Sequence, residues 1–507
     1  MKQVDNKRRV KKINSTQVNG WMNEFAKQPE HLLASNLMYA NGINAVALKP
    51  QSDSYTSFDF EINLPSQIAS NQYMSGRCWL FAAVNLIREG ICGSLELDYL
   101  DLSQSYLAFW DKFERANFFL ECIIDTIDQD VESRYVHYFL TNVIADGGQW
   151  DMAKNIIEKY GIVPKTVFPD SMNSANTNDL NFVINWILRA GAKELRDQAN
   201  KSHTNLLKIK DKILEDVFKV LVSCYGTLPE TFDFEYTLKR YSQCKDCFYH
   251  PQSNYYNYIN PYNIYHIKKV DKALTPLTFY QKYVRTKLTD YVSVINAPTN
   301  EKPLYRRFTF KYLNNVIGGE PIMHYNVSIN VLKYLAIVSL KSRRPLWFGA
   351  DVSFYGNRNT GIWDDQAFDY EVVLGTKFDL DSKGEELDYR AATMNHAMLI
   401  TGVDYDSSAL SAFQQKLNNL KGQEALKFID ENFDSIGTKK WKIQNSWGTN
   451  IGNNGYFLMT DSWFSHYVFQ LVVQKSILNE LTQRIEVSSF DEEPINLEPW
   501  DPIGTLA

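Results

Sequence analysis

The chain lacks features on which several classes of protein depend. Its six cysteines among 507 residues are too few for a disulfide scaffold. It has no run of 18 apolar residues, and its first residues contain no apolar stretch typical of a secretory signal. A formal net charge of −6 gives no overall electrostatic attraction for nucleic acid. We therefore expect a cytoplasmic protein whose partners include neither a membrane nor a nucleic acid.

Signals for bound metals and cofactors are also scarce. The sequence holds no P-loop, dinucleotide-binding fingerprint or EF-hand loop. Cys244, Cys247 and His250 lie close enough in sequence to suggest zinc, but only His266 is available to complete the set. A loop within a tyrosine-rich segment is the simpler interpretation of this cluster. We expect no metal and no cofactor.

The chain does contain material for a large buried interior, with 44% hydrophobic and 14% aromatic residues. Its first half has helical patterns, with apolar residues at the helical period from Cys78 to Gly90 and a long helical stretch over Asn178–Ser223. The second half contains short apolar or β-branched runs of strand length at Val327–Leu340, Pro345–Val352, Met398–Val403, Lys440–Ile443 and Tyr456–Met459. The segment Asp406–Gly437 interrupts these runs and is expected to be a helical surface insertion. We predict an α+β fold of two packed lobes with a cleft between them.

The strongest functional signal is the segment around Cys78. At a helix N-terminus the macrodipole and the free N–H groups favour negative charge, which lowers the pKa of a thiol and enriches the nucleophilic thiolate. Gln72, six residues upstream, can aim its amide N–H at the same place. With the backbone N–H of Cys78 it would form an oxyanion hole, in which one lost donor typically costs about 2.7–4 kcal/mol of transition-state stabilisation.

His396 and Asn445 supply the remaining parts of a thiol-based site. His396 directly precedes an apolar run of strand type, so its ring can emerge at a strand start and act as the base for Cys78. Asn445 begins an Asn-Ser-Trp-Gly run and can accept the other imidazole N–H, which would fix the ring orientation. Trp447 would cover that hydrogen bond from water.

Each of these residues alone has an ordinary explanation. A buried cysteine is usually an inert apolar residue, a histidine beside an apolar run is usually structural, and Asn-Ser-Trp-Gly can be a simple turn. The order Cys78, His396, Asn445 with these neighbours is not explained in that way. It is the chain order of papain-like cysteine peptidases.

On these motifs the chain resembles the papain-like peptidases, with Gln72 and Cys78 in the places of the oxyanion glutamine and the nucleophile. Gly147 and Gly148 lie where that family carries a glycine pair along the cleft, and they would let a substrate backbone approach. The C-terminal run Leu497–Ala507 resembles the ending of one branch, the bleomycin hydrolase and bacterial aminopeptidase C family.

The resemblance implies a papain-like two-lobe fold, with a helical lobe, a β-barrel-like lobe and helical insertions. It also implies a cysteine aminopeptidase of broad specificity and of the bleomycin hydrolase type, which acts on peptides with a free N-terminus. Relatives of this branch are homo-oligomers, usually hexamers, and we expect a hexamer here. Their C-terminal arm lies in the cleft, where the carboxylate of Ala507 would bind the amine of the substrate.

This resemblance divides the chain into an N-terminal lead-in or hook (1–65), a helical lobe (66–177), a helical insertion region (178–303), a β-rich lobe (304–486) and a C-terminal arm (487–507). Two alternatives to the aminopeptidase stay open. An endopeptidase would need the arm to leave the cleft, and an inactive barrel-shaped binding particle would need no catalytic residues. The intact set of Gln72, Cys78, His396 and Asn445 argues against the inactive particle.

Overall fold

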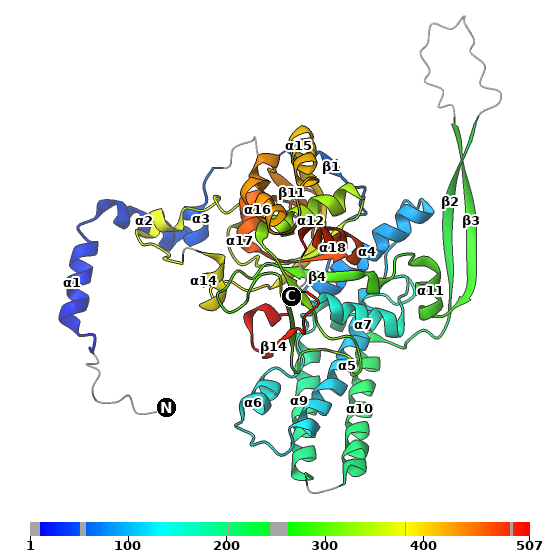
Figure 1. Ribbon diagram of the computed structural model, residues 1–507. Coiled ribbons are helices and arrows are strands. Elements are labelled where there is room, and N and C mark those ends of the chain that lie inside the picture. Colours follow the sequence, from blue (N-terminus) through cyan, green and yellow to red (C-terminus); the bar gives the residue numbers. More distant parts are fainter. Residues whose placement is uncertain are drawn as a thin grey trace, which may run out of the picture.

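The computed structural model describes residues 11–50, 57–199, 202–243, 262–380, 382–486 and 490–506, and within 239–243 and 262–266 it describes the backbone only. A mixed sheet runs through the body of the molecule (Figure 1). Its strands in spatial order are β14 (Ile495–Leu497), β5 (Arg307–Phe310), β6 (His324–Asn326), β4 (Tyr291–Ile295), β13 (Val468–Gln474), β7 (Leu346–Ala350), β10 (His396–Asp404), β11 (Lys440–Gln444), β12 (Tyr456–Thr460), β9 (Ile362–Trp363) and β8 (Gly356–Asn357), and β1 (Ile62–Asn63) pairs with β10. Most neighbouring strands are antiparallel, while β14 and β5, β6 and β4, and β12 and β9 are parallel.

The strands direct alternate side chains into two hydrophobic clusters. In β10, Ala397 and Leu399 belong to the first cluster, and Met398 and Ile400 belong to the second. The first cluster contains helices α4 (Cys78–Leu95), α5 (Gln104–Asp125), α7 (Trp150–Tyr160), α9 (Asn178–Asp197) and α10 (His203–Tyr225). The second contains α12 (Ile329–Lys341), α15 (Ser407–Leu417), α16 (Gly422–Asn432), α17 (Asp461–Tyr467) and α18 (Lys475–Ile485). The shorter helices are α3 (Ile43–Ala47), α6 (Arg134–Thr141), α8 (Met172–Ala175), α11 (Pro276–Tyr283), α13 (Tyr370–Leu374) and α14 (Lys383–Asp388). The protein is therefore an α+β fold.

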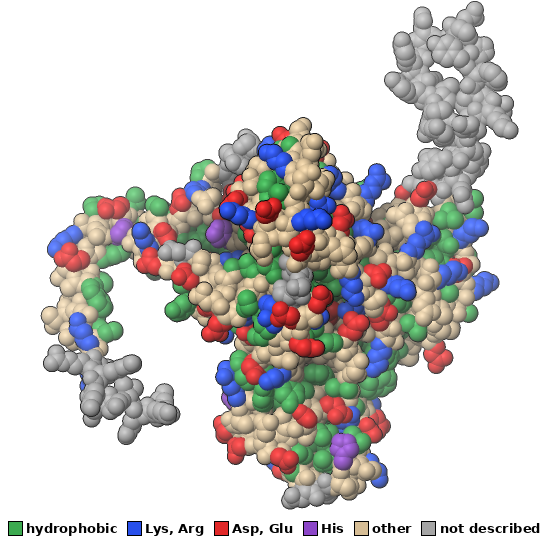
Figure 2. Space-filling view, in the orientation of Figure 1, with side chains coloured by type: hydrophobic (Ala, Val, Ile, Leu, Met, Phe, Trp, Pro, Cys, Tyr) green, Lys and Arg blue, Asp and Glu red, His purple; other side chains and the backbone are tan. Residues whose placement is uncertain are grey.

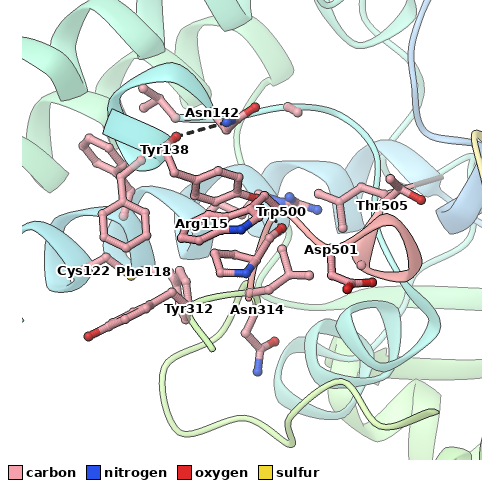
Figure 3. A pocket seen from close by; sticks show the side chains of 18 residues that line it. Arg115, Phe118, Cys122, Tyr138, Asn142, Tyr312, Asn314, Trp500, Asp501 and Thr505 are labelled. Carbon is pink, nitrogen blue, oxygen red and sulfur yellow. Dashed lines mark hydrogen bonds between the residues drawn. The ribbon is translucent and has the colours of Figure 1, made fainter. Parts of the chain in front are cut away.

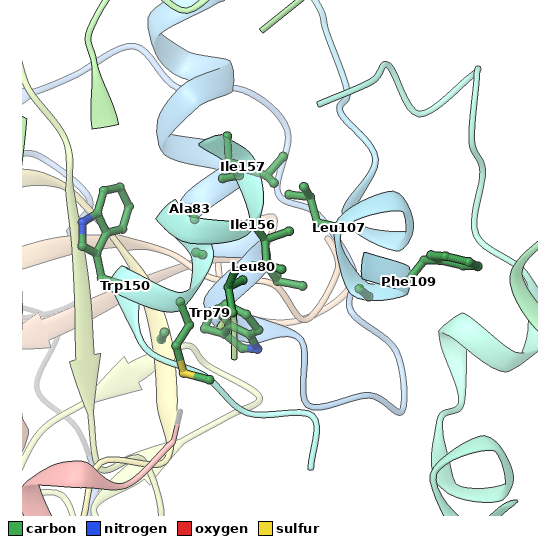
Figure 4. Packing of buried hydrophobic residues seen from close by; sticks show 14 of the residues in the cluster. Trp79, Leu80, Ala83, Leu107, Phe109, Trp150, Ile156 and Ile157 are labelled. Carbon is green, nitrogen blue, oxygen red and sulfur yellow. The ribbon is translucent and has the colours of Figure 1, made fainter. Parts of the chain in front are cut away.

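Helix α4 lies at the centre of the first cluster (Figure 4). Trp79, Leu80 and Ala83 are buried there and pack with Trp150 and Ile156 of α7. Since burying one large apolar side chain contributes roughly 1.5–3 kcal/mol, this packing fixes the start of α4 firmly. By length and composition α4 is apolar enough to cross a membrane, but most of it is buried within the protein, as in the core helix of a soluble fold.

Four of the predicted strand runs are confirmed, as β7, β10, β11 and β12, but the fifth prediction is wrong. The run Val327–Leu340 forms helix α12 instead of a strand. The hydroxyl of Ser328 caps this helix by accepting the N–H of Val331, and Leu332 and Leu335 are fully buried one turn apart. An apolar run that is buried on most sides does not reveal its period in the sequence.

Two segments differ in secondary structure or in burial from what their sequences predict. The segment Asp406–Gly437 forms α15 and α16, and buried side chains such as Phe413 and Ile429 make it part of the second cluster and not only a surface insertion. Residues 178–303 are not wholly helical, because α10 is followed by a two-stranded ribbon, β2 (Phe232–Gln243) and β3 (Tyr262–Leu274), and then by strand β4 of the main sheet. The Tyr- and Asn-rich composition of this region has weak periodicity and hides these strands.

Two parts of the chain project from the body in Figure 1, the β2–β3 ribbon and the N-terminal helices α1 (Ser15–Phe25) and α2 (Pro29–Asn41). Neither α1 nor α2 buries any of its residues. Apolar side chains are nevertheless present along them, including Trp21 (55% exposed) and Leu33 (62% exposed), and Figure 2 shows hydrophobic side chains along α1. A pair of helices with apolar, solvent-facing side chains is typical of a surface that another chain covers.

Candidate active site

Cys78 is the first residue of α4, and only 2% of it is exposed. Burial raises the pKa of its thiol to about 11, while backbone N–H groups, including that of Ala397, oppose the shift. The sequence predicts a lowered pKa from the helix N-terminus, but in the structure the loss of solvent outweighs the helix. A thiolate at this position would therefore need a further source of stabilisation.

His396 is the first residue of β10, where it lies opposite Ala350 of β7. Its ring is buried, and Nε2 donates a hydrogen bond of 2.9 Å to Oδ1 of Asn445. This bond requires the imidazole proton on Nε2 and leaves Nδ1 as the basic nitrogen. Burial lowers the pKa of the ring to about 4; the bond to Asn445 opposes that shift, and the charge of Arg358 adds to it.

Asn445 and Trp447 hold this ring in place. Oδ1 of Asn445 also accepts the backbone N–H of Ser446 at 2.8 Å, so the acceptor for His396 is itself fixed. The indole of Trp447 stacks on the imidazole, with ring centroids 4.8 Å apart and an angle of 25° between the planes. The ring of His396 consequently has little freedom to turn.

Gln72 is tied to the same segment by backbone and side-chain bonds. Its N–H donates to the carbonyl of Ser446 at 2.8 Å, and the N–H of Gly448 donates to the carbonyl of Ser70 at 2.9 Å. The hydroxyl of Ser446 donates to Oε1 of Gln72 at 2.6 Å, and Nε2 of Gln72 donates to the carbonyl of Ser75 at 2.6 Å. One N–H of the Gln72 amide is thus used to fix the side chain, and the second donates to none of the residues that the structure describes.

The sequence reasoning missed Asp146, which organises the start of α4. Its carboxylate accepts hydrogen bonds from the N–H of Gly76 at 3.1 Å and from Nζ of Lys112 at 2.6 Å, and its carbonyl accepts Nε1–H of Trp79 at 2.7 Å. Asn181 adds a further donor at 2.9 Å. Burial alone would raise the pKa of Asp146, but Lys112 and these donors hold it well below its usual range. The Asp-Gly-Gly run marks the position, whereas no sequence signal connects it to Lys112.

The predicted glycine pair is close to this network, and its neighbours fix its position. A Cβ added to Gly148 would lie 2.5 Å from the indole of Trp79, so the absence of a side chain is required by packing behind the cleft. The carbonyl of Gly147 accepts a hydrogen bond of 2.6 Å from Arg115. Both glycines are therefore held at fixed positions next to the residue that follows Cys78.

The C-terminal arm, residues 490–506, is held along its length. Strand β14 pairs with β5, and Asp501 forms an ion pair of 3.2 Å with the buried Lys302. The carbonyl of Thr505 accepts a hydrogen bond of 2.5 Å from Nε2 of Gln149, which directly follows the glycine pair. The predicted carboxylate of Ala507 lies outside the described residues, but Thr505, two residues before it, is bonded to Gln149 beside the glycine pair.

The arm also closes a cavity of about 350 Å3 against α5 and α6 (Figure 3). Trp500 is the anchor on that side, since the guanidinium of Arg134 lies 4.0 Å from its ring centroid and the hydroxyl of Tyr138 donates to the carbonyl of Pro499 at 3.0 Å. Figure 3 shows Trp500, Asp501 and Thr505 facing this cavity. Neither Cys78 nor His396 lines this cavity, so it is separate from the candidate active site.

The structure therefore brings Gln72, His396, Asn445 and Trp447 into one hydrogen-bonded and stacked unit next to Cys78. In the part of the chain that the structure describes, the thiol of Cys78 makes no hydrogen bond to the ring of His396; it lies instead against the N–H of the next residue, Ala397. The possible zinc ligands Cys244, Cys247 and His250 and the side chain of His266 lie outside the described residues. The described residues contain no cluster of three or more potential metal ligands.

Comparison with known proteins gives matches along almost the whole chain. Residues 12–264, 249–427 and 424–504 match the model of the Peptidase C1-like family. Aminopeptidase C of Listeria innocua serovar 6a is 36% identical over 495 residues, which cover 98% of this chain and 99% of that protein. Bleomycin hydrolase of Gallus gallus is 33% identical over 488 residues, with 95% of each chain covered. The crystal structure of PepW from Lactobacillus rhamnosis HN001 is similar to this one with a TM-score of 0.83, at 36% identity, and covers 98% of this chain and 99% of that one.

Proposed function

Because the chain belongs to the Peptidase C1-like family, we propose that it is a cysteine aminopeptidase in which Cys78 is the nucleophile and His396 its base. The papain-like fold of that family and the relatives named Aminopeptidase C and bleomycin hydrolase support the enzyme class. The observation that carries the assignment of residues is the bond between His396 and Asn445 beside the buried thiol.

The reaction starts from a neutral thiol and a neutral imidazole, because burial disfavours both charged forms. When the side chain of Cys78 turns from Ala397 toward Nδ1 of His396, the thiol proton passes to the ring and the two new charges stabilise each other. The sulfur then attacks the carbonyl carbon, and the oxyanion is stabilised by the backbone N–H of Cys78 and the second amide N–H of Gln72. The imidazolium protonates the leaving amine, and the ring later takes a proton from the water that hydrolyses the thioester.

The arm accounts for the restriction to N-terminal residues. Its last described residues lie at Gln149, beside Gly147 and Gly148, and a carboxylate at Ala507 would pair there with the α-ammonium of a peptide. That pairing would place the first peptide bond over Cys78 and exclude longer extensions on the amine side.

The proposal includes a homo-oligomer, a hexamer by family resemblance, because α1 and α2 present apolar side chains without burying any residue.

It also includes a cytoplasmic location, which the four free cysteines among the described residues support. The two hydrophobic clusters support a description of the fold as a helical lobe and a β-barrel-like lobe.

Paired fluorogenic substrates test this function. One has a free N-terminus and the other the same residue with a blocked N-terminus, and each is assayed with and without a thiol alkylator. Cleavage of the free substrate alone, abolished by the alkylator, is the expected result. Cleavage of the blocked substrate at a similar rate would indicate an endopeptidase instead.

A further inference from the structure

Arg358 lies in the turn between β8 and β9, next to the site but outside the reaction described above. Its Cζ atom is 4.7 Å from the centroid of the Trp447 indole, the same ring that stacks on His396. The side chain is exposed, and it makes no hydrogen bond or ion pair with any other residue that the structure describes. Its N–H donors are therefore available to a ligand.

The turn that carries Arg358 is firmly held. Oδ1 of Asn357 accepts the N–H groups of Asn359 at 3.1 Å and Thr360 at 3.3 Å. The carbonyl of Asn359 accepts the N–H of Gly452 at 3.2 Å, which joins the turn to the loop that follows Trp447. The backbone of Arg358 is consequently fixed before any ligand arrives, which lowers the entropic cost of binding.

The role of His396 shows which part of a substrate lies near Arg358. The imidazolium has to protonate the leaving amine, so the leaving part of the peptide lies beside His396 and the neighbouring Trp447. The amine side of the peptide, in contrast, lies toward the arm and Gln149. Arg358 therefore faces the C-terminal part of the substrate.

We propose that Arg358 binds the C-terminal carboxylate of short peptides and so favours substrates of two to four residues. This inference rests on the proposed function. The centroid of Trp447 is 4.8 Å from that of the imidazole and 4.7 Å from Cζ of Arg358. A leaving group of one to three residues covers a span of this order, at about 3.3–3.6 Å per residue. A guanidinium binds a carboxylate through two parallel N–H bonds, which a lysine cannot reproduce.

The test compares three peptides with a free N-terminus: Leu-Gly-Gly, Leu-Gly-Gly amide and Leu-Asp-Gly amide. Each is assayed with the wild-type protein, with Arg358→Gln and with Arg358→Lys, and release of leucine gives kcat/KM. The control variant is Arg285→Gln, which removes another exposed arginine that has no described hydrogen bond or ion pair. Assays are made at the flat part of the pH profile, because Arg358 also lowers the pKa of His396.

The readout is the ratio of kcat/KM for Leu-Gly-Gly to that for its amide. We expect Arg358→Gln to lower this ratio about 10-fold, Arg358→Lys to lower it less, and Arg285→Gln to leave it unchanged. An unchanged ratio in Arg358→Gln would refute the proposal. A loss confined to Leu-Asp-Gly amide would refute it as well, because the ligand would then be an acidic side chain. If the wild-type protein cleaves none of the three peptides, the proposed function itself fails.

Discussion

Cys78 and His396 occupy positions where burial opposes the charge that each would carry in the proposed mechanism. The pKa of the thiol is raised to about 11 and that of the imidazole is lowered to about 4. In the proposed mechanism, contact between the sulfur and Nδ1 makes the thiolate, because each new charge then stabilises the other in place of the lost solvent. Protonation of the ring removes the base, so the acidic limb of kcat/KM should lie below about pH 6.5, the ordinary value for histidine.

Replacement of Cys78 by serine should remove peptidase activity while the fold persists. A serine hydroxyl is far less acidic than a thiol, and a ring with a lowered pKa is too weak a base to activate it. Hydrolysis of a free-N-terminal fluorogenic substrate measures the loss, and circular dichroism with thermal melting checks the fold. Turnover above a few per cent of wild type would exclude Cys78 as the nucleophile.

His396→Ala and Asn445→Ala should differ in size and in pH dependence. His396→Ala removes both proton transfers, so we expect a loss of several orders of magnitude and no bell-shaped profile. Asn445→Ala removes only the acceptor that orients the ring, so the loss should be smaller and the bell shape should remain. Profiles of kcat/KM against pH separate the two variants. A larger loss in Asn445→Ala would contradict the assigned roles.

Lys112→Met should destabilise the protein although Lys112 does not touch the nucleophile. It would leave the carboxylate of Asp146 buried without its cation, which typically costs about 3–5 kcal/mol. Lys193→Met is the matched control, because the ion pair of Lys193 with Asp197 is largely exposed and should contribute less than about 0.5 kcal/mol. Chemical denaturation of both variants gives the free energies of unfolding. Equal values would mean that Asp146 does not depend on Lys112.

At the scale of helices and strands, the site is an assembly of segments distant in sequence. The backbone bonds between Gln72 and Ser446 join the approach to α4 to the loop after β11. The sequence predicts both segments and their chemistry, because Cys78 begins an amphipathic helix and His396 begins an apolar strand. It does not predict that Asp146 and Lys112 meet, since nothing local relates residues on separate elements. The same applies to Arg358, whose partner Trp447 lies in another loop.

Fold prediction succeeded for the short apolar runs and failed for the longest one, Val327–Leu340. Strands β10, β11 and β12 have apolar runs with clear ends, and their predicted bounds differ from the observed ones by only a few residues. Helix α12 also consists of an apolar run, but Ser328 caps its N-terminus and its buried side chains recur at the helical period. Both features stabilise a helix at this position. A cap next to such a run is the signal that distinguishes the two cases.

Removal of residues 504–507 should change the specificity of the enzyme. Without them the bond from Gln149 to Thr505 is lost, and the new terminal carboxylate, on Ile503, is four residues short of the place proposed for pairing with the substrate amine. We expect a lower kcat/KM for substrates with a free N-terminus and new cleavage of N-blocked peptides. Parallel assays of the two substrate types measure the change. Full aminopeptidase activity together with continued rejection of blocked peptides would show that the arm does not set the specificity.

At the scale of the whole molecule, the exposed apolar residues of α1 and α2 predict assembly. Light scattering at micromolar concentration should give a particle several times the chain mass of 58.7 kDa. Deletion of residues 1–41 should reduce the size of that particle, because the helices contribute apolar surface and no core. A wild-type monomer would contradict the prediction, as would a truncated protein of unchanged assembly size.

The way in which the arm is seated has a practical consequence for recombinant work. Pairing of β14 with β5 and the ion pair of Asp501 with Lys302 fix the chain shortly before its end. If the end of the arm pairs with the substrate amine as proposed, residues appended after Ala507, such as a purification tag, would crowd the region beside Gln149 where that amine binds. A tethered segment of this kind competes with substrate at an effective concentration of about millimolar, and dilution does not relieve it. Protein prepared for enzymology should carry its tag elsewhere, and removal of a C-terminal tag should increase the activity.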